Sequence, residues 1–394
     1  MELLRKENST MKITIIGWYG TETIGDRAIL AGLLSFFQKA YADFEIHLGS
    51  LYPFFSERTI NEDYKFYQEI MKQDVKITLF DSKDSKALLG AIKKSHLLVM
   101  GGGPLMDMDE LFMLEYAFKK AQKMGVKTAL LGAGIGPLFQ KKYRKSVLEI
   151  SLKSDLIILR DKRSKSNLEE IYIQFNKTFI ADTVYTSFDP AVEAVLQYKN
   201  IEKCVEQKPY IAVNLRAFPQ EYNDQKSLGD IDTALKKFTL DLSLKYKEQE
   251  IRLIPMHYFH IGGDDRSFLN SIALELEQEN IKVQNKPLNL KETIAIYEGA
   301  SFNIGMRFHS VVLQTIVSGK NYVLDYTEPK RGKIAGFLAD IDTKDFFEER
   351  YISLQEDKID IEMIRNIDMK FLYKDDEIEK KLEVYIQNLK MLFL

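Results

Sequence analysis

Two residues that suit the chemistry of an anionic substrate stand two positions apart late in the chain. The segment GMRFHS, residues 305–310, contains Arg307 and His309 and follows a short apolar run. If that run is a strand, alternation along its end puts both side chains on the same side. An arginine binds an anion through charge-assisted hydrogen bonds, and a histidine moves a proton near neutral pH. Ser310 is then the expected N-cap of a following helix.

Further cations follow two other expected strands. ILRDKRS, residues 158–164, contains Arg160. Its guanidinium could bind an anion through two parallel hydrogen bonds, or it could form an ion pair with Asp161 at the start of the next helix. DYTEPKRGKIAGFL, residues 325–338, offers three cations, of which one could lie beside Arg307; a solvated surface loop is the alternative. These three cations are Lys330, Arg331 and Lys333.

Glycine-rich segments follow three of the expected strands. They are GWYGTETIGDRAIL (17–30), MGGGPLMD (100–107) and LGAGIGPL (131–138). Gly20 and Gly25 permit close backbone approach, and Asp26 in a first helical turn complements the helix dipole. The first segment is neither a G-x-G-x-x-G fingerprint nor a P-loop. Ligands of open parallel sheets bind at the carboxyl ends of strands, so the three segments suggest a glycine-lined floor for a bulky ligand. Tight turns against neighbouring loops are the alternative.

A metal site is the less favoured interpretation of IPMHYFHIGGDDRSF, residues 254–268. The segment brings His257 and His260 near Asp264 and Asp265, which are potential metal ligands. The two adjacent aspartates are more typical of a helix start. We therefore expect no bound metal.

The elements that must position these residues alternate between short apolar strands and amphipathic helices. This rhythm predicts α/β architecture with two Rossmann-like domains facing a cleft. We expect an N-terminal domain over residues 11–190, a C-terminal domain over 205–345 and a helical extension over 346–394. Near the end, one helical face is apolar and is expected to pack back on a domain; because lysines flank it, a membrane-surface helix is the alternative. That face consists of Ile378, Leu382, Tyr385, Leu389 and Leu392.

Composition narrows the function classes. The chain has 394 residues and a net charge of −3, which gives no electrostatic reason to expect nucleic acid. A single cysteine, Cys204, excludes an intramolecular disulfide and a Cys-rich metal site. No apolar run is long enough to span a membrane, and residues 1–10 do not resemble a secretory signal. We expect a cytoplasmic protein.

In their order along the chain, these motifs resemble the polysaccharide pyruvyl transferase family. The resemblance spans residues 12 to 338 and includes SFDPA (187–191) and KIAGFL (333–338) besides the segments above. It implies a GT-B-like enzyme that transfers the enolpyruvyl unit of phosphoenolpyruvate to a sugar as a cyclic ketal. It also implies that Arg307 and His309 serve the donor, joined by Arg160 and a lysine before GFL. We take Lys333 rather than Lys330 as that lysine.

The mechanism expected from this resemblance uses the cations to bind phosphoenolpyruvate and His309 as the general acid. No metal or other cofactor is formally needed, because the cations neutralise the phosphate. The first loop then forms one wall of the acceptor site, where an aromatic ring stacks on a sugar face. The sequence departs from the family pattern at Thr23 and Arg27, which become the first positions to test for acceptor choice. The expected acceptor residues are Trp18, Tyr19, Gly20, Thr23, Asp26, Gly102, Gly103 and Asp107.

Two other functions fit the same motifs. A GT-B glycosyltransferase would use an Arg/Lys pair to hold the diphosphate of a nucleotide sugar. A non-catalytic saccharide-binding protein would bind a glycan without using His309. For the pyruvyltransferase, capsule, exopolysaccharide and cell-wall polymers are all compatible substrates. The expected acceptor is a saccharide, either free or linked to undecaprenyl diphosphate. In the second case we expect the protein to associate at most peripherally with the inner face of the membrane.

Overall fold

The computed structural model of the chain divides into two units. It describes all residues except 1–9, 202–208, 220–227 and 261–262, so Cys204 lies outside the described residues. The first unit holds residues up to Thr21, Asp26–Ala194 and Asp375–Leu394; the second holds Glu22–Gly25 and Val195–Lys374. Residues 346–374 therefore belong to the second unit, and the last helix belongs to the first.

The first unit is built on a parallel sheet in the order β3-β2-β1-β4-β6-β7-β8, with β5 paired to β6. Its strands are β1 (Met11–Ile16), β2 (Phe44–Ser50), β3 (Lys76–Asp81), β4 (Leu97–Gly101), β5 (Pro104–Leu105), β6 (Lys127–Ile135), β7 (Leu156–Leu159) and β8 (Val184–Thr186). Its helices are α1 (Ile24–Ala40), α2 (Pro53–Met71), α3 (Ser85–Lys94), α4 (Glu110–Lys123), α5 (Lys141–Leu152), α6 (Lys162–Gln174), α7 (Pro190–Lys199) and α13 (Asp375–Met391). The first two residues of α1 and the second half of α7, from Val195 on, belong to the second unit.

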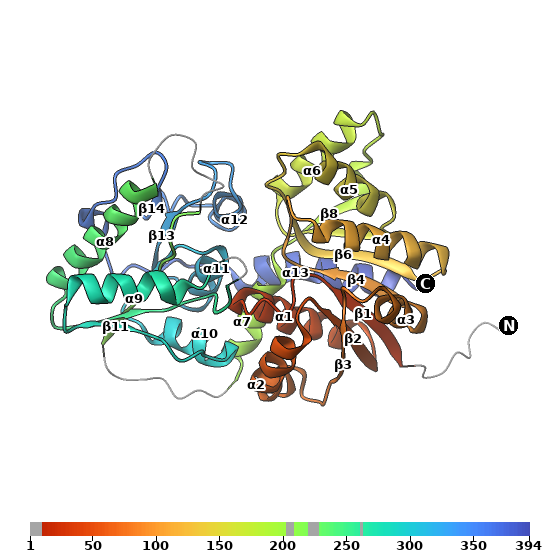
Figure 1. The fold of residues 1–394 in the computed structure, drawn as a ribbon, viewed down its shortest axis with the longest axis horizontal. Coiled ribbons are helices and arrows are strands. Elements are labelled where there is room, and N and C mark those ends of the chain that lie inside the picture. Colours follow the sequence, from red (N-terminus) through yellow and green to blue (C-terminus); the bar gives the residue numbers. More distant parts are fainter. Residues whose placement is uncertain (1–9, 202–208, 220–227, 261–262) are drawn as a thin grey trace. The chain divides into compact units, whose positions relative to one another are not determined.

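The second unit repeats this plan of strands flanked by helices (Figure 1). Its parallel sheet has the order β11-β10-β9-β12-β13-β14. Its strands are β9 (Tyr210–Asn214), β10 (Glu250–Leu253), β11 (Ile281–Val283), β12 (Asn303–Gly305), β13 (Asn321–Asp325) and β14 (Tyr351–Ser353). Its helices are α8 (Leu228–Lys245), α9 (Asp265–Leu276), α10 (Leu290–Gly299), α11 (Phe308–Val317) and α12 (Lys333–Ile341). In chain order this is the 3-2-1-4-5-6 order of a Rossmann sheet, and the predicted pair of Rossmann-like domains is confirmed.

The C-terminal helix packs back on the first unit, as predicted from its apolar face. Ile378, Leu382, Tyr385 and Leu389 are buried. The ring of Tyr385 stacks on Phe36 of α1 with 4.3 Å between centroids, and its hydroxyl donates to the carbonyl oxygen of Phe188 at 2.7 Å. The apolar face of α13 is therefore used inside the protein. Within the described residues, we find no helix whose length and hydropathy would let it cross a bilayer.

Candidate functional site

The central strands of the second sheet, β9 and β12, define its topological switch point. The connection from β9 leads to one side of the sheet and that from β12 to the other, and ligands of such sheets bind at the carboxyl ends of these two strands. Arg216 stands two residues after β9, and Arg307 stands two residues after β12. Asn214 links the strand ends, because its Oδ1 accepts from the backbone N–H of Arg307 at 2.9 Å and its Nδ2 donates to the Ile254 carbonyl at 2.9 Å.

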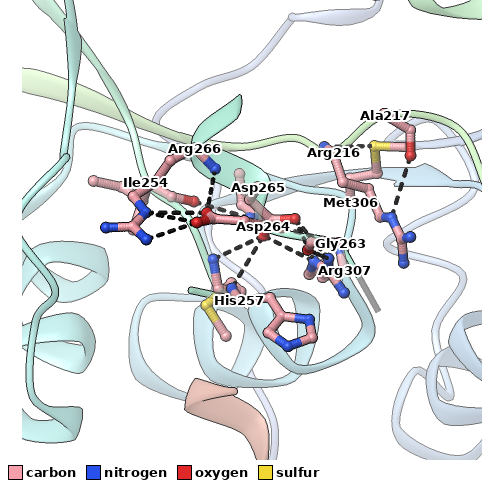
Figure 2. A network of polar contacts seen from close by, with 12 residues as sticks. Arg216, Ala217, Ile254, His257, Gly263, Asp264, Asp265, Arg266, Met306 and Arg307 are labelled. Atoms are coloured by element: carbon pink, nitrogen blue, oxygen red, sulfur yellow. Dashed lines mark hydrogen bonds and ion pairs between the residues drawn. The ribbon is translucent and has the colours of Figure 1, made fainter. Parts of the chain in front are cut away.

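Arg307 is held by a buried carboxylate. Its Nε donates to Oδ1 and Oδ2 of Asp265 at 2.9 and 2.8 Å, and its Nη2 donates to Oδ1 at 2.6 Å. Nη2 also donates to the carbonyl oxygen of Gly263 at 3.2 Å. Figure 2 shows the two side chains facing each other at the start of α9. Burial favours the neutral form of the guanidinium, but Asp265 outweighs it and raises the pKa of Arg307 above its usual value.

Three cations act on one buried phenol, Tyr326, which directly follows β13. The guanidinium of Arg216 lies 5.3 Å from the ring centroid, and Nζ of Lys333 lies 5.5 Å from it. Burial alone raises the pKa of the phenol, yet Lys333, Arg216 and Arg307 together bring the pKa of Tyr326 below its ordinary value. Positive potential strong enough to overcome burial marks a place where a ligand's negative charge would be stabilised.

The structure separates the two candidate lysines. Lys333 is the first residue of α12 and is half-buried against Tyr326. Lys330 is exposed in the preceding turn, with a left-handed φ of 55°. The helix N-terminus adds its own positive potential beside Lys333. Of the two, Lys333 is therefore the one placed among the other cations.

His309 reaches this edge of the sheet by a different route from the one predicted. Strand β12 ends at Gly305, so Arg307 is the N-cap of α11, in extended conformation, and His309 lies in the first helical turn. The expected strand alternation of the two side chains is wrong, because the backbone has already left the sheet. Ser310 is not the N-cap either; its hydroxyl donates to the carbonyl oxygen of Arg307 at 2.7 Å.

The segment Glu22–Gly25 lies in this second unit beside His309. Ile24 N–H donates to the Met256 carbonyl at 3.0 Å, Tyr258 N–H donates to the Glu22 carbonyl at 3.3 Å, and Thr23 forms an antiparallel bridge with His257. A β-carbon on Gly25 would overlap the imidazole of His309. Thr23, which we placed in the acceptor wall, is thus within the segment that packs against the predicted general acid.

The remaining residues of the first loop are packed inside the first unit. Trp18 and Tyr19 are 8% and 5% exposed, and their side chains donate to the carbonyl oxygens of Pro104 and Gly101 at 3.0 Å each. Neither ring therefore exposes a face on which a sugar could stack. Gly20 has a φ of 93°, so its backbone conformation requires glycine whether or not a ligand binds there.

Packing also accounts for the other glycine clusters. Gly102 and Gly103 have φ values of 68° and 73°, and β-carbons there would meet Ile29 and Trp18. Gly132 and Gly134 lie in the same way against Pro190 and Arg160. The predicted glycine-lined floor is thus filled by the unit's own side chains, which is the alternative that the sequence left open.

The two acidic acceptor candidates, Asp26 and Asp107, form hydrogen bonds within the first unit as well. Thr21 Oγ1 donates to Asp26 at 3.3 Å, and the N–H groups of Phe139 and Gln140 donate to Asp107 at 3.2 and 3.0 Å.

Arg160 and Arg27 belong to buried ion pairs of the first unit. Arg160 is 3% exposed and lies 3.4 Å from Asp189 and 3.5 Å from Asp161, whereas Arg307, His309 and Lys333 belong to the second unit. Arg27 forms a fork with Asp63, donating from Nε at 2.5 Å and from Nη2 at 2.7 Å. The fork gives Arg27 a structural role that explains the departure from the family pattern, so it is no longer a leading candidate for acceptor choice.

The predicted helix start at the two aspartates is confirmed. Asp264 is the N-cap of α9 and accepts from the N–H of Arg266, whose guanidinium it also binds at 2.6 Å. Among the described residues, no group of three or more histidine, cysteine, aspartate or glutamate side chains is arranged to hold a metal ion.

Sequence reasoning missed Arg216, Tyr326 and the role of Asp265. Arg216 had a usable signal, since NLRAF directly follows a strand at the same edge as the other motifs. Tyr326 stands within the segment 325–338, where the three cations are the more conspicuous signal. The partnership of Asp265 with Arg307 joins two strand ends and has no counterpart in local spacing.

Solved structures share the fold at low sequence identity. UDP-GlcNAc 2-epimerase of Methanocaldococcus jannaschii superposes with a TM-score of 0.59 at 14% identity, covering 97% of this chain and 100% of that one. UDP-GlcNAc 2-epimerase of Neisseria meningitidis gives 0.54 at 10% identity, covering 96% and 99%. A glycosyltransferase from Rickettsia africae gives 0.51 at 11% identity, covering 98% and 94%. The fold is therefore the two-domain, Rossmann-like GT-B fold.

Sequence comparison assigns the family. A search of curated proteins finds no significant match to this chain. The sequence model of the family described as "Polysaccharide pyruvyl transferase" matches residues 24–326, which is most of the chain and includes Arg160, Arg216 and the segment with Arg307 and His309. The chain belongs to the polysaccharide pyruvyl transferase family.

Proposed function

We propose that the protein transfers the enolpyruvyl unit of phosphoenolpyruvate to two hydroxyls of a sugar and forms a cyclic pyruvate ketal. The observation that carries this proposal is the convergence of Arg216, Arg307 and Lys333 around Tyr326 at the switch point of the second sheet, with His309 on the neighbouring helix turn. Phosphoenolpyruvate bears a carboxylate and a phosphate, so its site needs several cations. Family membership supports the same assignment.

The cations divide the work of binding this donor. Because Asp265 balances the charge of Arg307, net positive charge comes from Arg216 and Lys333. Arg307 contributes oriented donors rather than net charge. We include Arg160 as a further donor ligand on the strength of the family motif alone, since its present contacts are to Asp161 and Asp189.

The reaction balances with one proton carrier. His309 gives a proton to the methylene carbon of phosphoenolpyruvate, while a sugar hydroxyl oxygen bonds to the adjacent carbon and returns its proton to His309. The bond from that carbon to the phosphate oxygen then breaks, and the second hydroxyl oxygen takes its place. The proton of the second hydroxyl leaves with inorganic phosphate. The cations stabilise the departing phosphate, and the proposal needs no further cofactor.

The acceptor in this proposal is a saccharide of a capsule, an exopolysaccharide or a cell-wall polymer. We propose that it is presented on a lipid carrier such as undecaprenyl diphosphate, with the protein in the cytoplasm and at most peripherally bound to the inner face of the membrane. In this proposal Thr23 contacts the acceptor, and its place in the same unit as His309 supports that role.

Calorimetric titration of the full chain separates this function from nucleotide-sugar transfer. The proposal predicts that phosphoenolpyruvate binds to the wild type, that Arg216→Ala weakens this binding, and that UDP does not compete. Binding of UDP or GDP without binding of phosphoenolpyruvate would instead support a glycosyltransferase. Glycan binding that is unchanged in His309→Ala, with no donor binding, would support a saccharide-binding protein.

A further inference from the structure

Asp265 is a buried carboxylate whose contacts converge on Arg307. The side chain of Asp265 is 1% exposed. Its oxygens accept from Arg307 and also from the backbone N–H groups of Met256 and His257, at 3.0 and 3.2 Å (Figure 2). Helix α9 does not depend on Asp265 for its cap, because Asp264 fills that role. The position of Asp265 is thus specified by what it holds.

From this geometry we propose that Asp265 is the positioning residue of the donor site: it fixes the guanidinium of Arg307 side-on, so that only one edge remains for an anionic group of phosphoenolpyruvate. The inference rests on the proposed function for the identity of the anion. Asp265 does not touch the reacting atoms. It acts through Arg307.

The hydrogen-bond pattern defines the remaining edge. Asp265 occupies Nε and Nη2 of Arg307, and the Gly263 carbonyl takes a second donation from Nη2. Nη1 makes no hydrogen bond to any residue in the described part of the chain. Two of the three guanidinium nitrogens therefore donate to the protein. The third, Nη1, remains to donate to a ligand. A guanidinium held on one edge loses little side-chain freedom when a ligand binds the other.

The same carboxylate couples the fork to the rest of the site. By accepting from the N–H groups of Met256 and His257, Asp265 fixes the backbone after β10. That backbone pairs with Ile24 and Thr23, directly before the glycine that His309 packs against. Moving Asp265 would therefore disturb both the arginine and the histidine.

The proposal separates orientation from affinity, which a purely structural carboxylate would not do. Asp265→Asn keeps the size of the side chain and removes its charge. The freed charge of Arg307 then attracts phosphoenolpyruvate at least as well as before, but its fork is no longer aligned. We expect kcat to fall by about 100-fold, the order of the loss when a reactive group is misplaced by an ångström, while KM for phosphoenolpyruvate does not rise. Asp264→Asn is the matched control, since it alters the adjacent carboxylate and its pair with Arg266; its kcat and KM should stay near those of the wild type.

A second readout does not depend on turnover. In ¹H–¹⁵N spectra of the full chain, the Nε–H signal of Arg307, assigned with Arg307→Lys, should be protected from exchange in the wild type and in Asp264→Asn, and exposed in Asp265→Asn. Equal kcat and equal Nε–H protection in the two asparagine variants would overturn the proposal.

Failure of the proposed function gives a different result. If the wild type neither binds nor consumes phosphoenolpyruvate, the proposed function fails, whereas the protection of the Arg307 Nε–H signal still decides whether Asp265 holds the guanidinium. If Asp265→Asn does not fold, Asp265→Glu serves instead, and exposure of the Arg307 Nε–H signal in it together with a normal kcat would likewise overturn the inference.

Discussion

The imidazole of His309 occupies the space that a β-carbon on Gly25 would fill. Gly25 is the second residue of α1, and its backbone does not have a positive φ, so the conformation itself does not require glycine. The requirement comes from the close approach of the ring. A glycine near the start of the chain and the predicted general acid late in it are thus parts of one packing unit.

This contact predicts that Gly25→Ala inactivates the enzyme without unfolding it. The methyl group would push the imidazole aside, since a side chain yields more easily than the helix backbone. We expect kcat to fall by about 100-fold or more, in line with misplacement of a catalytic group by about an ångström. Phosphate release from phosphoenolpyruvate measures this loss.

The control is Gly90→Ala in α3, where an added β-carbon meets no atom within 4 Å. That substitution should raise the free energy of unfolding by about 1 kcal/mol, because alanine is the better helix former, and it should leave kcat unchanged. Normal turnover by Gly25→Ala would show that the position of His309 against Gly25 is not needed for catalysis.

Lys333 and Lys330 should differ sharply when each is replaced by alanine. Lys333 lies beside Tyr326 with the other cations, whereas Lys330 is exposed in the turn before it. Lys333→Ala should weaken phosphoenolpyruvate binding by about 10-fold to 100-fold, the effect of losing one charge-assisted hydrogen bond. Lys330→Ala should bind as the wild type does. Calorimetry of both variants measures the difference, and the reverse ranking would move the donor site to the turn.

Tyr326 should ionise at a lower pH than Tyr198. Three cations lower the pKa of this phenol although burial opposes it, whereas burial and Glu298 raise the pKa of Tyr198. Between the folded and unfolded pKa values of Tyr326, the unfolded chain holds the extra proton, so the advantage of the wild type over Tyr326→Phe in unfolding free energy should grow as the pH rises.

The ultraviolet phenolate spectrum follows this titration directly. Tyr326→Phe should remove a phenolate that forms at lower pH than an ordinary tyrosine, and Tyr198→Phe should leave that early step intact. An early titration step that survives unchanged in Tyr326→Phe would mean that the cations do not act on this ring.

Arg27 should matter for stability. Its guanidinium is 7% exposed, and its partner Asp63 is buried at 1%. Arg27→Met removes the guanidinium that pairs with this buried carboxylate and should cost about 3–5 kcal/mol of unfolding free energy, measured by denaturant titration. Arg58→Met removes the partly exposed pair with Glu62 and should cost less than about 1 kcal/mol. Should Arg27→Met be as stable as Arg58→Met and change acceptor choice instead, the structural role would be refuted.

The fold was predictable because its signals are local. Apolar strands and amphipathic helices alternate in chain order, and a parallel sheet of this kind has few permitted connections. The helix start at Asp264 follows from capping chemistry that a few adjacent residues specify.

The site was predictable only where it followed strand ends. That rule applies to Arg307 and Lys333, and it applies equally to Arg216, which was overlooked. The exact end of β12 was not readable, because Asn214 from another strand binds the N–H of Arg307 beyond it. The glycines misled for a related reason: a sequence shows that space is needed at Gly103 or Gly134, but not that Trp18 and Arg160 fill it.

Conversion of phosphoenolpyruvate in the presence of an acceptor tests the central claim most directly. ³¹P spectra of the full chain with phosphoenolpyruvate and a panel of lipid-linked oligosaccharides should show inorganic phosphate forming as a ketal carbon appears in the ¹³C spectrum of labelled donor. His309→Gln should bind phosphoenolpyruvate and form neither product. Ketal formation by His309→Gln at the wild-type rate would contradict the role given to His309. Absence of donor binding by the wild type would contradict the site itself.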